Sequence, residues 1–274
     1  MPVRPSARSP VRNFFCNQSN FIRQILNLLT MKSMRIFSMF LFAGLFIGMA
    51  SLFASCNVTG GVHGNGNIQK ETRKLSGFEA LEVSGAFDII LKQGATEEVI
   101  VEADNNLLPL IRTEVVGGTL TIETRKPINH VTVMKVYVTL KDLKRVDVSG
   151  AVDITTDGRI TTDELSIDAS GASDSQLNLA VKKLKLECSG ASKIKFSGYS
   201  SDVNMELSGA SDIFAYDFLV ETYDIGISGA GNAQLNVSKK LRADISGAGS
   251  VKYKGSPAEV DQSISGAGSI RKVE

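Results

Sequence analysis

The sequence predicts an all-β protein: a parallel β-solenoid (β-helix-like) of coils about 19 residues long, with a less regular β-rich N-terminal part before it. Three observations lead to this fold class. The tripeptide Ser-Gly-Ala recurs along the chain, the residues before it alternate between apolar and polar, and a short β-type run follows it. Twenty-five glycines, six prolines and the lack of tryptophan also suit a turn-rich β protein.

The repeat has a nearly constant period. Ser-Gly-Ala occurs eight times, and the last seven copies are 21, 19, 19, 20, 18 and 19 residues apart. Their serines are Ser84, Ser149, Ser170, Ser189, Ser208, Ser228, Ser246 and Ser265. A fixed period over more than 110 residues is typical of a solenoid, in which each repeat forms one coil.

Each repeat contains two short strands. The residue before Ser-Gly-Ala is always apolar, the next one back is polar or glycine, and the third is apolar except at Gln262. This alternation predicts a half-buried strand. A second run follows the tripeptide, as in "KIKF" at 193–196 and "SVKYK" at 250–254. Strands of about five residues bury too little area alone, so the coils are expected to stack.

Ser-Gly-Ala itself suits a repeated corner. Glycine accepts a positive φ, alanine is small enough for a crowded bend, and serine can hydrogen-bond backbone groups left unpaired by the turn. The repeat is also compatible with a meander of 19-residue hairpins that folds into a sandwich, and this alternative stays open at this point.

The first part of the chain has the pattern of an export signal. Residues 1–30 are interpreted as a leader or a mis-called start. Residues 31–55 begin with Lys32 and Arg35 and continue with an apolar run up to the small residues before Cys56, which is typical of a secretory signal. "FASC" resembles the lipobox of bacterial lipoproteins, which predicts lipid attachment at Cys56. A plain transmembrane anchor is the alternative, because the run is about 19 residues long.

Charge and cysteine content limit the kinds of partner and of cross-link that the sequence allows. The chain has 30 Lys and Arg, six of which precede residue 57, and 29 Asp and Glu, none of which does, so the remainder has a net charge of −5. A nucleic-acid partner is therefore not expected, because it requires a clustered basic face. With Cys56 lipidated, Cys188 has no partner for a disulfide within the mature chain, and the core must supply the stability.

Two segments precede the regular repeats. Residues 56–67 are rich in glycine and asparagine and predict a flexible tether after the lipidated cysteine. Residues 68–140 predict a β-rich part that caps the solenoid of residues 141–274, since an uncovered end leaves an unpaired strand edge. Within it we expect a hairpin with Gly117-Gly118 at its turn and a short helix capped by Asp104.

These motifs together resemble a known bacterial family. The Ser-Gly-Ala corners followed by "FDI", "VDI" or "SDI", the opening "FEALEVSGAFDIIL" and the stretch "NNLLPLIRTEVVGGTLTI" are similar to the family called putative auto-transporter adhesin, head GIN domain. The resemblance covers Phe78 to the C-terminus. It implies an exported protein or lipoprotein with β-solenoid character, no established activity and a role in adhesion.

One column of acids is a candidate cation site. Asp147, Asp168, Glu187 and Glu206 occupy equivalent outward positions in four successive coils. If they stack about 5 Å apart, their repulsion requires neutralisation, which a divalent cation would provide. The alternative is a solvated face on which nearby cations such as Arg145, Lys185 and Lys195 screen the charge.

Other residue sets predict structure rather than chemistry. Cys188 is expected in the core, and His63 and His130 are too isolated to predict a metal or acid–base site. A second column is interpreted as structural and consists of Asp153, Asp174, Lys193, Asp212, Asn232, Ser250 and Ser269. A sugar-binding face is a further hypothesis for the aromatic residues Tyr199, Phe214, Tyr216, Phe218, Tyr223 and Tyr253.

The sequence is compatible with two functions. The first is a non-enzymatic cell-envelope lipoprotein, anchored in a membrane through its N-terminal lipid, that presents an extended solenoid face to a protein or glycan partner as an adhesin or scaffold. No cofactor is expected. The alternative is a carbohydrate-active β-helix enzyme that acts on polysaccharide. Coils of 18–21 residues leave no long loops from which to build a catalytic cleft, which favours binding.

Overall fold

The computed structural model describes residues 60–274. It is an all-β structure, as the sequence predicts. The leader at 1–30, the signal segment at 31–55 and Cys56 lie outside the described residues. In residues 60–274 no helix is long and apolar enough to cross a membrane.

In residues 60–274 the fold consists of fifteen strands and one 3₁₀ turn. The turn, η1, covers Leu108–Leu110. The strands are β1 (Val62–His63), β2 (Ile68–Arg73), β3 (Ala80–Gln93), β4 (Glu98–Asp104), β5 (Ile111–Val116), β6 (Thr119–Thr124), β7 (Ile128–His130), β8 (Met134–Leu140), β9 (Arg145–Thr156), β10 (Ile160–Gly209), β11 (Asp212–Gly229), β12 (Asn232–Gly247), β13 (Ser250–Lys254), β14 (Glu259–Gly266) and β15 (Ser269–Lys272).

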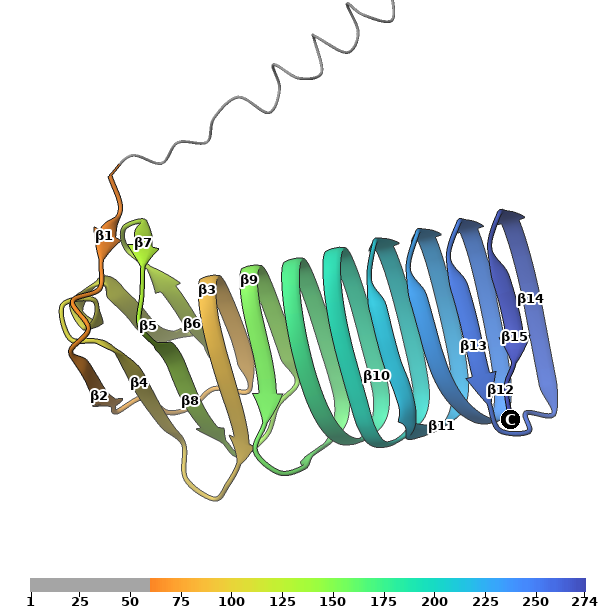
Figure 1. Ribbon diagram of the computed structural model, residues 1–274. Helices are drawn as coiled ribbons and strands as arrows, with labels where there is room; N and C mark the ends of the chain where they lie inside the picture. The colour runs from red at the N-terminus through yellow and green to blue at the C-terminus, as the bar shows by residue number, and fades with distance from the viewer. Residues whose placement is uncertain (1–59) are drawn as a thin grey trace, which may run out of the picture. The chain divides into compact units, whose positions relative to one another are not determined.

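One large mixed sheet contains nearly all of these strands, in the order β15-β13-β12-β11-β10-β9-β3-β8-β4-β2 along its main path. The strands from β3 and β9 to β15 pair in parallel, whereas β2 with β4, β4 with β8 and β5 with β6 pair antiparallel. Figure 1 shows the parallel strands as a row of bends and the antiparallel strands at its N-terminal end.

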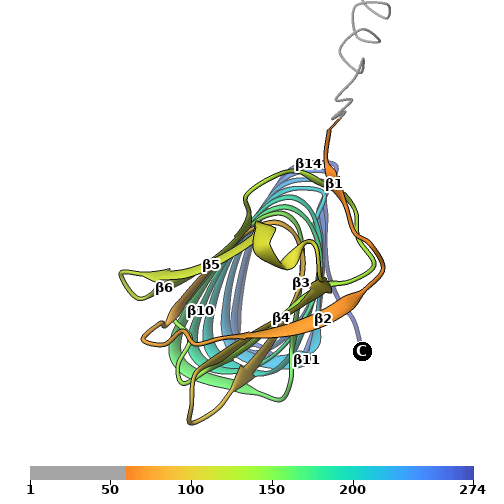
Figure 2. The same cartoon turned by 90° about the vertical axis from the view of Figure 1, so that its left-hand side faces the viewer.

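Equivalent residues of successive repeats are in register. Asp147 pairs with Asp168, Leu207 with Ile227, and Ile227 with Ile245. Viewed along the row, the bends lie one behind the other around a shared interior (Figure 2). Alternate side chains point into this interior, because successive side chains of a strand face opposite ways. Phe196 and Phe218 pack there with ring centroids 5.6 Å apart, and both are buried.

The corner glycines explain why the same tripeptide returns. Gly190 has a φ of +138°, a conformation that favours glycine. A Cβ on Gly190 would collide with the carbonyl oxygen of Gly171, and one on Gly209 would collide with that of Gly190. Strands β9 to β12 and β14 include the Ser-Gly residues of their corners, because these residues also pair with the same residues of the neighbouring repeat. The amide of Ala210, for example, donates to the carbonyl of Gly190 over 2.9 Å.

The first bend lies earlier in the chain than the sequence boundary at residue 141 suggests. Strand β3 pairs with β9 in register from Ala80–Arg145 to Leu91–Thr156. The chain then forms β4 to β8 before it returns at β9. This excursion accounts for the long interval between Ser84 and Ser149.

The N-terminal part agrees with the prediction at one place and differs from it at another. Gly117 and Gly118, with φ of +58° and +79°, form the predicted turn between β5 and β6. Asp104, however, caps no helix. Its buried carboxylate accepts hydrogen bonds from the amides of Gly66 (2.6 Å) and Thr132 (2.8 Å) and from the Thr132 hydroxyl (3.0 Å). These donors lower the pKa of Asp104, and the amide of Thr132 is the largest cause.

Part of the segment predicted as a flexible tether, 56–67, is held in place in the structure. Val62 and His63 form β1, which pairs in parallel with β7. Asn65 donates its side-chain amide to Asn105 over 2.7 Å, and Gly66 is bound to Asp104 as described above. Residues 62–67 are therefore fixed to β7, to the last residue of β4 and to the loop that follows β4.

Candidate functional site

The repeated bends create two outer surfaces. The pre-corner face contains the outward side chains two and four positions before each Ser-Gly-Ala serine. The post-corner face contains those four and six positions after it, together with Tyr199, Tyr216, Asn236 and Lys254 near the next bend. Both faces consist of columns that cross successive strands, because the strands pair in register.

The pre-corner face is acidic. From β9 to β14 it carries more carboxylates than cations. The carboxylates are Asp147, Asp168, Glu187, Glu206, Asp224, Asp244 and Asp261, and the cations are Arg145, Lys185 and Arg242. This excess has the same sign as the net charge of the chain after residue 56.

Three of the four proposed cation ligands lie together. Asp168, Glu187 and Glu206 line a shallow hollow of about 210 Å³, and Asp147 is in register with Asp168. Arg145 forms an ion pair with Asp147, and Lys185 forms one with Glu187 at 2.6 Å. Hydrogen bonding to Glu187 raises the pKa of the Lys185 ammonium, which holds the positive charge in place. Two of the three screening cations expected from the sequence are thus in contact with the column.

No group of three or more His, Cys, Asp and Glu in residues 60–274 is arranged to hold a metal ion. The cation site at Asp147, Asp168, Glu187 and Glu206 therefore stays a prediction. The ion pairs favour the solvated face that was its alternative.

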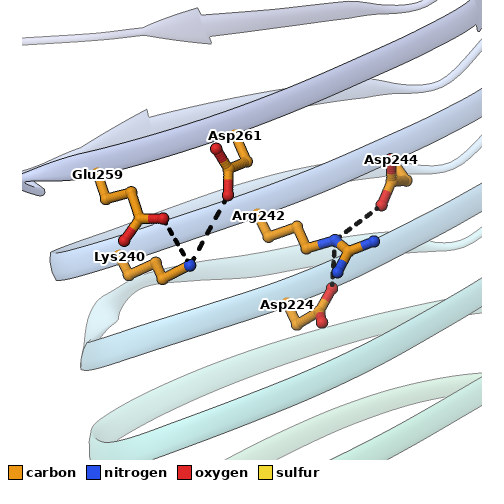
Figure 3. Close-up of polar contacts among 6 residues, drawn as sticks. All are labelled: Asp224, Lys240, Arg242, Asp244, Glu259 and Asp261. Atoms are coloured by element: carbon orange, nitrogen blue, oxygen red, sulfur yellow. Dashed lines mark hydrogen bonds and ion pairs between the residues drawn. The ribbon is translucent and has the colours of Figure 1, made fainter.

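Further ion pairs join the last strands on the same side. Lys240 contacts Glu259 at 2.7 Å and Asp261 at 3.7 Å, so it ties β12 to β14. Arg242 lies between Asp244 at 3.2 Å and Asp224 at 3.9 Å (Figure 3). The cations on this side of the stack are thus used within the chain.

A groove of about 1100 Å³ lies over β10 and β11, on the side of the row of bends that carries the pre-corner face. Its lysines are also paired within the chain: Lys183 contacts Glu164 at 2.9 Å, and Lys144 contacts Glu79. Besides these lysines, the groove is lined by hydroxyls, carboxylates and the apolar residues Leu165, Leu184 and Val203.

The post-corner face is different in composition. One column runs through Lys195, Phe214, Gln234, Lys252 and Arg271, each in register with the next. Lys195, Lys252, Lys254 and Arg271 form no ion pair with any residue in the described range 60–274. We call Lys195, Phe214, Tyr216, Gln234, Asn236, Lys252, Lys254 and Arg271 the basic–aromatic face.

The rings on this side lie beside cations. The Nζ atom of Lys193 lies 5.8 Å from the ring centre of Phe214, and that of Lys254 lies 5.5 Å from the ring centre of Tyr216. Arg159 lies 5.9 Å from the ring centre of the exposed Tyr199. The six aromatic residues of the sugar-face hypothesis do not share one surface, since Phe218, Tyr223 and Tyr253 are buried.

The second column of the sequence analysis is continuous and polar. The amide of Asp174 donates to Asp153 over 2.6 Å, and Lys193 lies 3.7 Å from Asp174. Asn232 donates to Asp212 over 2.8 Å. The hydroxyl of Ser250 donates to Asn232 over 2.7 Å. This column therefore links neighbouring repeats through hydrogen bonds, in agreement with its structural interpretation.

The structure brings the two histidines together. His63 and His130, 67 positions apart in the chain, are paired residues of β1 and β7, and their ring centroids are 6.2 Å apart. The sequence shows no sign of this contact, because β1 and β7 are only two and three residues long and lie far apart in the chain. Cys188 is buried, and burial raises the pKa of its thiol to about 12, which suits a core residue.

Comparison with known proteins identifies the family. The family model described as "putative auto-transporter adhesin, head GIN domain" matches residues 77–257. The chain belongs to this family.

Solved structures support the GIN-domain fold. A protein from Bacteroides fragilis described as a putative adhesin is 24% identical with a TM-score of 0.73, and the match covers 78% of this chain and 100% of that one. A putative adhesin from Parabacteroides merdae is 26% identical with a TM-score of 0.58, covering 78% and 99%. A putative lipid binding protein from Parabacteroides distasonis is 26% identical with a TM-score of 0.61, also covering 78% and 99%. No curated protein matches this chain.

The basic–aromatic face is the feature that the sequence analysis missed. Its signal lies two residues after the last five members of the second column, where Lys195, Phe214, Gln234, Lys252 and Arg271 occur. The overall acidic charge of the chain after residue 56 concealed this local excess of cations.

Proposed function

We propose that this GIN-domain protein is a non-enzymatic lipoprotein of the cell envelope. In this proposal residues 141–274 form a β-solenoid that presents an extended face to a protein or glycan partner, as an adhesin or a binding scaffold does, and residues 68–140 cap it. The observation that carries the proposal is the regular parallel register from β9 to β15, which produces long outer columns.

The form of these faces favours binding over catalysis. The repeats between Ser149 and Ser265 differ in length by only a few residues, so no long loop rises beside a face to enclose a substrate. A broad surface instead suits many weak contacts along an extended partner. Family membership and the description of similar structures as adhesins agree with this assignment.

The anchor rests on the sequence around Cys56, which lies outside the described residues. Cys56→Ser removes the thiol that would take the lipid. We expect the unchanged chain, expressed in a Gram-negative host, to incorporate radiolabelled palmitate and sediment with membranes, and the variant to do neither. Membrane sedimentation of Cys56→Ser would instead support the plain transmembrane anchor. Cys188→Ser is the matched control and should behave like the unchanged chain.

The binding role is tested with the detergent-solubilised full chain on a panel of polysaccharides and matrix proteins. We expect retention on at least one of them and no new reducing or unsaturated sugar ends after prolonged incubation. The appearance of such ends would favour the carbohydrate-active enzyme. Protease treatment of intact cells should cleave the chain if it lies on the cell surface.

A further inference from the structure

We propose that the basic–aromatic face binds an acidic polysaccharide that lies along the stack, across the strands. This inference rests on the proposed binding function and names the chemical class of its ligand. It depends on three properties of the face: its cations have no carboxylate partner in residues 60–274, its rings are half-buried, and its residues form continuous columns.

The first property is the state of the cations. Lys195, Lys252, Lys254 and Arg271 contact no carboxylate within 4 Å in residues 60–274. On the opposite side Lys183, Lys185 and Arg242 all have carboxylate partners. Unpaired cations grouped on one face of an otherwise acidic protein repel one another, and an anionic ligand relieves this repulsion. The pre-corner face would repel the same ligand, so charge selects one side of the stack.

The second property is the aromatic surface between the cations. Phe214 and Tyr216 are partly buried, so their neighbours hold them in place while part of each residue stays accessible. A sugar ring has a flat side of C–H groups that packs against an aromatic ring. The lysines beside these rings have long flexible stems, so their ammonium groups can turn towards an acid group of the sugar while the ring keeps the contact.

The third property is the order along the column. Lys195, Phe214, Gln234 and Lys252 follow one another in register, at about 4.8 Å per strand. The Gln234 and Asn236 amides lie between the rings and the last cations and can hydrogen-bond sugar hydroxyls. The amide of Asn236 is also fixed, because it donates to the carbonyl of Tyr216 over 3.1 Å. The column from Lys195 to Lys252 has a cation at each end and a ring and an amide between them, which suits a polymer with acid groups along its length.

Two acids next to this face already have partners within the described residues. Asp174 lies 3.7 Å from Lys193, and Asp212 accepts the amide of Asn232. They form the neighbouring polar column and so limit the width of the basic strip. A narrow strip of this kind favours a single extended chain over a flat anionic membrane, which would require cations spread over a wider area.

The test uses polygalacturonate, which carries a carboxylate on each sugar, with neutral dextran as the comparison ligand. The binding variant is Lys252→Gln with Lys254→Asn, since Gln234 and Asn236 occupy the equivalent positions in the preceding repeat. The control is Lys183→Thr with Lys185→Asn, which removes the same charge from the other side and copies Thr222 and Asn204. Phe214→Gln tests the ring and copies its register partner Gln234. Circular dichroism and the melting temperature establish that each variant is folded.

We expect the full chain to bind polygalacturonate and not dextran. The affinity should fall about tenfold or more in Lys252→Gln with Lys254→Asn, because two charge-assisted contacts are lost, and should be unchanged in the control. Phe214→Gln should weaken binding without changing its salt dependence, since the ring carries no charge.

Three outcomes would overturn the inference. They are equal affinity for polygalacturonate and dextran, equal loss in the binding and control variants, and binding to vesicles of phosphatidylcholine and phosphatidylglycerol in preference to the polysaccharide. If the chain binds another ligand of the panel while polygalacturonate fails, the proposed function holds and only this inference falls. Failure of every ligand would remove both.

Discussion

Replacement of a corner glycine tests the stacking on which the outer faces depend. Gly190 has a φ of +138°, and a Cβ there would overlap the carbonyl oxygen of Gly171. The left-handed conformation costs an L-residue about 1–2 kcal/mol. Relief of the overlap adds about 1–3 kcal/mol, because the obstacle is backbone and cannot rotate away. Alanine also restricts the unfolded chain, and this offsets the cost of Gly190→Ala by less than about 1 kcal/mol. We therefore expect a net loss of about 3 kcal/mol.

Two other glycines separate these contributions. Gly158 has a φ of +90° but nothing within 4 Å of a Cβ, so Gly158→Ala bears only the conformational cost and should lose about 1 kcal/mol. A Cβ on Gly226 meets only the flexible side chain of Glu206, and its φ is not in the left-handed region. Gly226→Ala should therefore cost less than about 1 kcal/mol. Urea unfolding followed by circular dichroism, in a Cys56→Ser background, gives the three values. Equal losses for Gly190→Ala and Gly158→Ala would refute the contact between successive corners.

Three buried groups give further predictions. Asp104→Asn should release residues 62–67 and speed their amide exchange, because an amide NH₂ would face the donors of Gly66 and Thr132. Since the pKa of Asp104 is lowered in the folded protein, the stability that this carboxylate contributes should be present at neutral pH. It should disappear as the pH falls below the ordinary aspartate pKa of about 4. Exchange of residues 62–67 that is unchanged in the variant would contradict this role. Tyr223→Phe should leave stability unchanged or raise it by about 1 kcal/mol, because the buried Tyr223 hydroxyl lacks a hydrogen-bond partner among residues 60–274, and a lower melting temperature would argue against this. The Cys188 thiol, with its pKa raised to about 12, should resist thiol reagents at pH 8 until urea unfolds the chain, and fast labelling of the native protein would show that the repeat opens.

Most of the fold could be predicted from the local periodicity of the sequence. The alternation before each Ser-Gly-Ala placed Ile167, Leu186 and Ile225 inside, and all three are buried. The hairpin at Gly117-Gly118 was also predictable, since two positive φ values in a two-residue turn favour glycine. These features depend on neighbouring residues and on a repeat that can be counted along the chain.

Contacts between distant segments were not accessible in this way. The buried Asp104 looked like a helix cap, because its partners Gly66 and Thr132 are 38 and 28 residues away. The pairing of His63 with His130 and the early bend at β3 were missed for the same reason. The basic–aromatic face required knowledge of which outward positions align, and this follows from register rather than from composition.

The register of the bends also bears on how such proteins change over generations. Since Ser228 lies over Ser208 and Ser246 over Ser228, one bend is geometrically interchangeable with the next. Duplication or loss of about nineteen codons would lengthen or shorten the molecule by one layer without disturbing the layers on either side. Reach and ligand chemistry can then evolve separately: the number of layers sets the reach, and single substitutions at outward positions set the chemistry.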